Sequence, residues 1–85
     1  MVAVAALTEQ VRETMATVFM VDVDELPENI SQLNYPRWTS LYHLTLLLAL
    51  EEEFGTSFAM EEMTAMTSED AIVTVLRGRE VDSAS

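Results

Sequence analysis

The apolar segment at residues 40–50 constrains the fold more than any other part of this chain. Its leucines recur at helical spacing, and it leads directly into three glutamates, Phe54 and Gly55. Gly55 can end a helix here, because glycine adopts the left-handed backbone that closes many helices. We therefore predict a helix that begins at Thr39 or Ser40 and ends near Phe54. The face that we assign to the core is Leu46, Leu47, Leu50 and Phe54.

A second apolar face follows the same predicted helix and is continuous with Ser40. It consists of Leu41, Leu44 and Leu48. Either the helix is buried on both sides, or this face is a partly exposed patch for a partner protein. We favour the patch, because a chain of 85 residues cannot cover every side of its central helix. Met60 is a further interface candidate, and the acids expected to flank the patch are Glu51, Glu52, Glu61 and Glu62.

Helical spacing also runs through the first part of the chain, where Val11, Met15 and Phe19 fall on one face. Thr8 can cap this segment, so we predict a first helix from Thr8 to Phe19. Residues 20–37 show no sustained period and contain two prolines. We expect a long loop there, pinned to the core by scattered apolar residues.

The last third of the chain contains two further helical segments. Residues 59–66 allow a short third helix, and Thr67 or Ser68 can cap a fourth. We expect Gly78 to end the fourth helix and residues 79–85 to form a flexible tail. The basic residues that suit the negative end of this helix are Arg77 and Arg79.

Every strong element is therefore helical. The pattern predicts an all-α fold of four helices, with a long loop between the first two helices and a short third helix. The chain has the length of one domain, residues 1–85, and we expect its core to span about residues 7–78.

The charge balance limits the partners that such a domain can have. Fifteen acids and four arginines, with no lysine, give a formal net charge of −11. This charge repels nucleic acid and anionic membranes and favours a basic protein partner. The absence of cysteine excludes disulfides and thiolate metal sites. No stretch has transmembrane length, and residues 1–7 make a poor signal peptide, so we expect a cytoplasmic monomer.

Ser40 is the clearest candidate for a residue with a chemical function. It lies in the first turn of the predicted second helix, where backbone N–H groups lack partners within the helix and the dipole is positive. Such a position suits a phosphate ester. A serine at a helix start is also a common structural cap, so the surrounding sequence must decide.

That surrounding sequence matches a known pattern. The run from Trp38 through Thr39-Ser40-Leu41 and His43 to the ending Leu50-Glu51-Glu52-Glu53-Phe54-Gly55 resembles the second helix of the acyl carrier protein family, which includes peptidyl carrier domains. It is most similar to free-standing carriers with a Trp-x-Ser-Leu-x-His motif. The likeness extends from about Leu7 to Arg77, through the acidity, the helix order and the late Thr67-Ser68-Glu69-Asp70 cap.

The resemblance implies an acyl-carrier-protein-like four-helix bundle, and it implies a function as well. It implies a 4′-phosphopantetheine arm on Ser40, installed from coenzyme A by a magnesium-dependent phosphopantetheinyl transferase, with Thr39 and His43 near the arm. The thiol of the arm would hold an acyl or aminoacyl group as a thioester, and the chain itself would not be an enzyme. Partners would be the transferase, a loading ligase and a downstream synthase or transferase. They would dock on Leu41, Leu44, Leu48, Glu51, Glu52, Met60 and Glu61.

Three residues depart from the family pattern. Thr39 replaces the usual aspartate, although its hydroxyl can still accept a hydrogen bond from the backbone of Leu41 or Tyr42. Arg37 replaces the usual glycine, and Thr45 stands where carriers of fatty acid synthesis commonly have an acid. The last change leaves the top of the helix less acidic and, with Tyr42 and His43, more aromatic, which points to a specialised pathway such as polyketide or nonribosomal peptide synthesis.

Other interpretations of the same residues stay open. Thr39 and Arg37 also fit a degenerate carrier that is never modified and acts as a scaffold or adaptor. Ser40 with His43 resembles a nucleophile and base, but no oxyanion loop accompanies them. His43 could instead contact a partner or the arm, or simply face solvent. Trp38 is either a buried anchor before the helix or an interface residue. The acids Asp22, Asp24 and Glu28 lack the spacing of a calcium loop, so we expect no metal site.

Overall fold

The computed structural model describes the backbone of residues 4–84 and the side chains of residues 6–79. The elements are α1 (Val4–Phe19), a 3₁₀ turn η1 (Val23–Glu25), α2 (Ser40–Phe54), α3 (Met60–Ala65) and α4 (Glu69–Ala84). Over this range the chain contains four α-helices and no strand beyond one isolated bridge between Ser31 and Ser68. The predicted all-α class, the helix order, the long first loop and the short third helix are confirmed.

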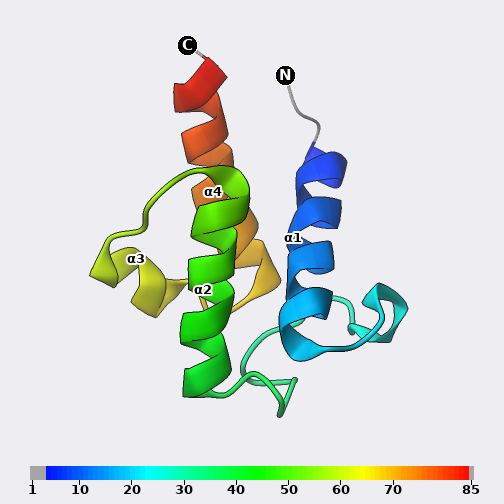
Figure 1. Cartoon of the computed structure of the whole chain (residues 1–85). Coiled ribbons are helices and arrows are strands. Elements are labelled where there is room, and N and C mark those ends of the chain that lie inside the picture. The colour runs from blue at the N-terminus through cyan, green and yellow to red at the C-terminus, as the bar shows by residue number, and fades with distance from the viewer. Residues whose placement is uncertain (1–3, 85) are drawn as a thin grey trace.

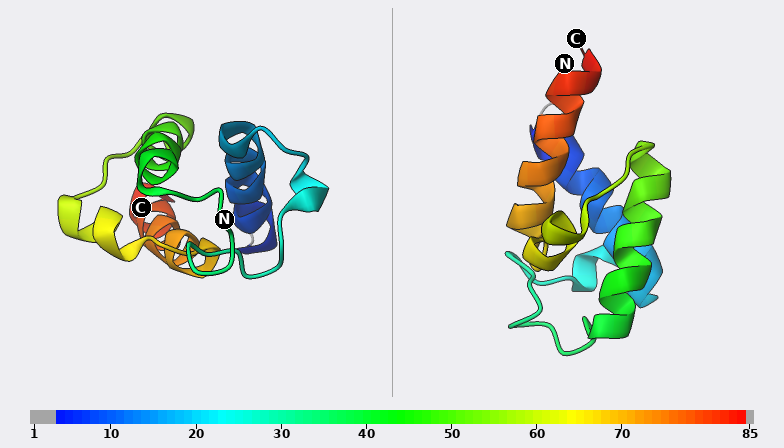
Figure 2. Two further views of the ribbon diagram at one scale, coloured as in Figure 1. Left: turned by 90° about the horizontal axis from the view of Figure 1, so that it is seen from below. Right: turned by 90° about the vertical axis from the view of Figure 1, so that its left-hand side faces the viewer.

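Three long helices form the body of the molecule. α1 runs antiparallel to α2 and α4 and packs against both (Figure 1). The short α3 lies beside α2 and runs crosswise to the long helices rather than along them (Figure 2). The loop between α1 and α2 crosses the end of the molecule at which α2 begins, so the start of α2 stands at one pole of the bundle.

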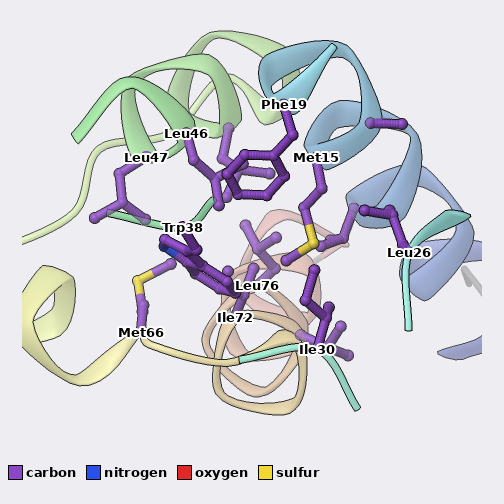
Figure 3. Packing of buried hydrophobic residues seen from close by; sticks show 14 of the residues in the cluster. Met15, Phe19, Leu26, Ile30, Trp38, Leu46, Leu47, Met66, Ile72 and Leu76 are labelled. Atoms are coloured by element: carbon purple, nitrogen blue, oxygen red, sulfur yellow. The ribbon is translucent and has the colours of Figure 1, made fainter. Parts of the chain in front are cut away.

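The core is made from α1, α2, α4 and the loops between the helices, including Met66 just after α3, as the sticks in Figure 3 show. Leu46, Leu47 and Leu50 are buried, as predicted for the core face of α2. Phe54, assigned to the same face, is only partly buried and packs at the edge of the cluster. The other members are Leu7, Val11, Met15, Ala16, Phe19, Leu26, Ile30, Trp38, Phe58, Met66, Ile72, Val73 and Leu76.

α1 begins at Val4, four residues before the predicted start, so Thr8 is an interior residue and not the cap. The predicted start was wrong because residues 4–7 favour a helix and Leu7 continues the buried stripe. The end at Phe19 is confirmed. Met20 then takes a left-handed backbone (φ 58°) and closes the helix.

α4 also extends beyond its predicted end. It continues through Gly78 to Ala84, so residues 79–84 are helical rather than a frayed tail, and Ser85 lies outside the described residues. An exposed glycine inside a helix costs only about 1 kcal/mol relative to alanine, which neighbouring contacts can offset. Arg77 and Arg79 therefore lie within the helix, not in its last turn.

The first loop is fastened to both α1 and α4. Arg12 of α1 donates to the carbonyl oxygens of Leu26 (2.8 Å) and Pro27 (3.1 Å) and pairs with Glu69 at 2.5 Å. Main-chain bonds add a second link, since the Gln32 N–H donates to the Thr67 carbonyl and the Glu69 N–H donates to the Ile30 carbonyl. The loop is thus ordered by the core, as its scattered apolar residues predicted.

Candidate functional site

Ser40 lies exposed at the first turn of α2. Thr39 precedes it in an extended conformation, and the Thr39 hydroxyl accepts a hydrogen bond from the Tyr42 N–H at 3.4 Å. The predicted capping role of Thr39 is therefore confirmed. No described protein group bonds the Ser40 hydroxyl or the backbone N–H groups of Ser40 and Leu41. Of the two adjacent hydroxyls, only the one on Ser40 is free and open to solvent.

An aromatic cluster packs around the residues that flank Ser40 in the sequence. The Phe19 ring, at the end of α1, lies 5.2 Å from the Tyr35 ring, 5.9 Å from Trp38 and 5.8 Å from Tyr42, measured between centroids. Tilted and edge-on contacts of this kind stabilise aromatic pairs beyond their buried area. Trp38 is 3% exposed, so it is the buried anchor and not an interface residue. The cluster fixes the approach of the chain to Ser40.

Arg37 is held at the base of the same turn. Its Nη1 donates to the Phe19 carbonyl oxygen at 2.9 Å, which satisfies one of the carbonyls left open at the end of α1. The Arg37 carbonyl oxygen in turn accepts from the Thr39 N–H at 2.9 Å. Arg37 therefore joins the end of α1 to the start of α2.

Both ring nitrogens of His43 are engaged inside the molecule. The Trp38 Nε1–H donates to His43 Nδ1 at 3.0 Å, and His43 Nε2 lies 2.8 Å from the Met63 carbonyl oxygen. Indole N–H can only donate and a carbonyl can only accept, so these contacts assign the neutral Nε2–H tautomer. His43 makes no hydrogen bond to Ser40, and the ring is not arranged as its base. The ring is partly buried and not plainly solvated.

The second face of α2 is exposed, which decides between the two explanations offered for it. Leu41 is 73% exposed, Leu44 and Leu48 are each 52% exposed, and Met60 at the start of α3 is 82% exposed. The helix is therefore not buried on both sides. We refer to Leu41, Leu44, Leu48 and Met60 as the apolar face. It begins one residue after Ser40.

The acids near the apolar face divide into two groups. Glu52 and Glu61 are exposed, with no hydrogen bond or ion pair among the described residues. Glu51, which we expected at the interface, uses its Oε2 to accept from the Phe58 N–H at 2.8 Å, and so holds the turn after α2. Glu62 pairs with Arg79 of α4 at 2.6 Å. The hydrogen bonds from Arg79 and from the Ala59 N–H hold the pKa of the Glu62 carboxyl below its ordinary value of 4.5.

Two of these functional contacts left no signal in the sequence. The carbonyl of Met63 is a backbone group, and its bond to His43 spans 20 positions. The spacing Trp38-x-x-x-x-His43 placed both residues near Ser40, but it did not reveal that one side chain donates to the other. Only the fold brings α3 to the side of α2.

Within the described part of the chain, no group of three or more acidic or histidine side chains is placed to hold a metal ion. None of the described helices has the length and apolarity needed to span a lipid bilayer. No protein-family model and no curated protein sequence matches this chain.

Proposed function

We propose that this protein is a discrete acyl or aminoacyl carrier that bears 4′-phosphopantetheine on the Ser40 hydroxyl. The observation that carries the proposal is the free, exposed hydroxyl of Ser40 in the first turn of α2, immediately beside the apolar face. The sequence resemblance to carrier proteins supports it independently. Among the side chains of residues 6–79, the other serines lack this combination of a helix start and a neighbouring exposed apolar surface.

The residues around Ser40 fit the attached group. The arm would supply a thiol that holds cargo as a thioester, which a chain without cysteine cannot offer itself. On modification, the Ser40 oxygen would lose its proton and form the phosphate ester, and adenosine 3′,5′-bisphosphate would leave. The open backbone N–H groups of Ser40 and Leu41 and the positive end of α2 favour the negative charge of that ester. The transferase would supply the base and magnesium.

The surface around Ser40 favours basic, partly apolar partners. The apolar face gives an anchor for docking, and the exposed carboxylates of Glu52 and Glu61 provide charge beside it. Three of the four arginines, Arg12, Arg37 and Arg79, are occupied by internal bonds. With a formal net charge of −11, which already includes the arginines, the surface is strongly acidic. A phosphopantetheinyl transferase, a loading ligase and a downstream synthase would each present a basic surface.

The departures from the family pattern support a role in a specialised pathway. Thr39 and Thr45 leave the start of α2 without the carboxylates usual in carriers of fatty acid synthesis. Thr45 instead bonds back to the Leu41 carbonyl oxygen at 3.1 Å. A synthase adapted to this helix would recognise an apolar surface with less charge than usual.

Intact mass spectrometry tests the proposal directly. The protein is incubated with coenzyme A, magnesium and a broad-specificity phosphopantetheinyl transferase. We expect a gain of one phosphopantetheinyl group in the wild type and in Thr39→Ala, and no gain in Ser40→Ala. No gain in the wild type, or an undiminished gain in Ser40→Ala, would overturn the proposal.

A second candidate function is that of an unmodified scaffold with a carrier-like fold. It is favoured by one observation, the cap formed by Thr39, which offers no carboxylate to a metal or a basic transferase. Protein purified from its native host distinguishes the two functions. Persistent absence of the arm at Ser40 favours the scaffold, and its presence favours the carrier.

A further inference from the structure

α3 is the α-helix that depends most on contacts with the rest of the protein. It has six residues, and its cap position is Ala59, whose side chain cannot accept a hydrogen bond. Helices this short are not stable in water without tertiary contacts. α3 also packs sparsely on the long helices. Its position must therefore come from a few specific contacts.

Those contacts lie at two places. On the side of α4, Glu62 pairs with Arg79. On the side of α2, His43 bonds the Met63 carbonyl oxygen at 2.8 Å, while Met66 anchors the end of α3 in the core. The pair between Glu62 and Arg79 is partly exposed, so solvent screens it. The bond from His43 is the direct polar link between α3 and the helix that carries Ser40.

The orientation of His43 is fixed from inside the core. The Trp38 Nε1–H occupies Nδ1 at 3.0 Å, and the two ring centroids lie 5.9 Å apart with planes tilted by 33°. Trp38 is itself held by Phe19 and buried. Since Nδ1 accepts, the ring carries its proton on Nε2, the nitrogen that faces Met63. The tautomer that Trp38 selects is thus the one that α3 needs.

We propose that His43 is a positioning residue, and that the chain of bonds Trp38–His43–Met63 fixes α3 against the first turns of α2. Leu41 of α2 and Met60 of α3 are both exposed, and this link holds the two helices that carry them in a fixed relation. A partner that docks there does not have to order α3 on binding, and preorganisation of this kind strengthens association. The consequence for docking rests on the proposed carrier function, whereas the positioning role does not.

Two variants separate the bond to Met63 from the bond to Trp38. In His43→Gln the side-chain amide nitrogen reaches the place of Nε2 and can donate to the Met63 carbonyl, but nothing accepts from Trp38. In His43→Asn the amide oxygen lies near the place of Nδ1 and can accept from Trp38, but the side chain is too short to reach Met63. A residue that merely filled space would not distinguish them in this way.

The first measurement is amide hydrogen exchange in the unmodified protein, followed by NMR. We expect the amides of residues 63–66 to exchange about three to ten times faster in His43→Asn than in the wild type, and at nearly the wild-type rate in His43→Gln. Amides in the middle of α1 serve as the internal control for global unfolding. The ¹⁵N shifts of the His43 ring should show the Nε2–H tautomer. Unchanged exchange in His43→Asn, or the other tautomer, would overturn the positioning role.

The second measurement is steady-state kinetics of the phosphopantetheinyl transferase with each variant as substrate. We expect His43→Asn to raise KM for the carrier about three- to tenfold with little change in kcat, and His43→Gln to stay near the wild type. Equal KM values for all three proteins would overturn the docking role. If the wild type is not modified at all, the carrier proposal fails, and the exchange and tautomer data still decide whether His43 positions α3.

Discussion

At the scale of single residues, the two adjacent hydroxyls at the start of α2 have different tasks. Thr39 closes the helix and Ser40 is left free, although both side chains are exposed. We expect Thr39→Ala to lower the free energy of unfolding by about 1 kcal/mol, the usual loss when a capping hydroxyl is removed. Urea denaturation followed by circular dichroism measures it. Ser40→Ala, which removes no described hydrogen bond, is the control and should differ from the wild type by less than about 0.5 kcal/mol.

Among single residues, we expect substitution of Arg12 to reduce stability more than substitution of Thr39. Its guanidinium satisfies two loop carbonyls and the carboxylate of Glu69, and all of them lie in partly buried surroundings. We expect Arg12→Met to cost about 2–3 kcal/mol of stability, because it leaves Glu69 and the two carbonyls without their donor. Arg77→Met is the matched control, since Arg77 is exposed and should change stability by less than about 0.5 kcal/mol. Similar losses in the two variants would contradict the role assigned to Arg12.

At the scale of the elements, α1 and α2 end in the same way with different residues. Gly55 and Met20 both take the left-handed backbone, at φ 61° and 58°. After α1 the Met20 N–H bonds the Thr17 carbonyl and the Val21 N–H bonds the Ala16 carbonyl, which together close the helix. Left-handed backbone costs a residue with a side chain roughly 1 kcal/mol, whereas glycine adopts it freely.

Introducing glycine at Met20 and removing glycine at Gly55 should therefore change stability in opposite directions. We expect Met20→Gly to stabilise the protein by about 0.5–1 kcal/mol and Gly55→Ala to destabilise it by about 1 kcal/mol. Met20 is exposed, so removing its side chain sacrifices little buried area. Thermal and urea unfolding of the two variants measure both changes. A destabilised Met20→Gly would show that the methionine side chain contributes more than its backbone costs.

The contact between α3 and α4 has its own dependence on pH. The Arg79 hydrogen bond lowers the pKa of Glu62 below 4.5 in the folded protein, so the unfolded chain takes up the proton first as the pH falls. The stabilisation from this pair is therefore complete above about pH 4.5 and is lost as the pH falls through the lower, folded pKa. We expect the stability difference between wild type and Glu62→Gln to be constant from pH 7 to pH 5 and to shrink below pH 4.5. Urea titrations at each pH measure it, and a difference that grew in acid would contradict this assignment.

The elements also show what the sequence could and could not predict. α2 was predicted to within one residue, because Thr39 and Gly55 are local signals and leucines recur at helical spacing between them. The start of α1 and the end of α4 were wrong, since there the signals at Thr8 and Gly78 were outweighed by helix propensity and by packing. At the site, the exposed face was predicted correctly. The bonds of His43 to the Met63 carbonyl and of Glu51 to the Phe58 N–H were missed, because these partners are backbone groups that only the fold brings near.

At the scale of the whole molecule, uncompensated negative charge is the dominant property. With a net charge of −11 and three of the four arginines used internally, acidic groups repel one another over most of the surface. Salt screens such repulsion, with a Debye length of about 10 Å at 0.1 M. The same screening weakens attraction to a basic partner. Salt should therefore act in opposite directions on folding and on docking.

A single series of buffers with increasing salt tests both effects, the one on folding and the one on docking. Raising sodium chloride from 0.05 to 0.5 M, conditions that span a Debye length from about 14 to 4 Å, should increase the midpoint of thermal unfolding. Over the same series the association rate with a basic transferase should fall several-fold, with a smaller change in the dissociation rate. Glu52→Gln should reduce the salt dependence of association and leave stability unchanged, because its carboxylate is exposed with no described bond. Glu51→Gln should instead lower stability, since its carboxylate holds the Phe58 N–H. Stopped-flow binding and thermal unfolding separate the two, and docking that strengthened with salt would place the apolar face, rather than the charge around it, in control of partner choice.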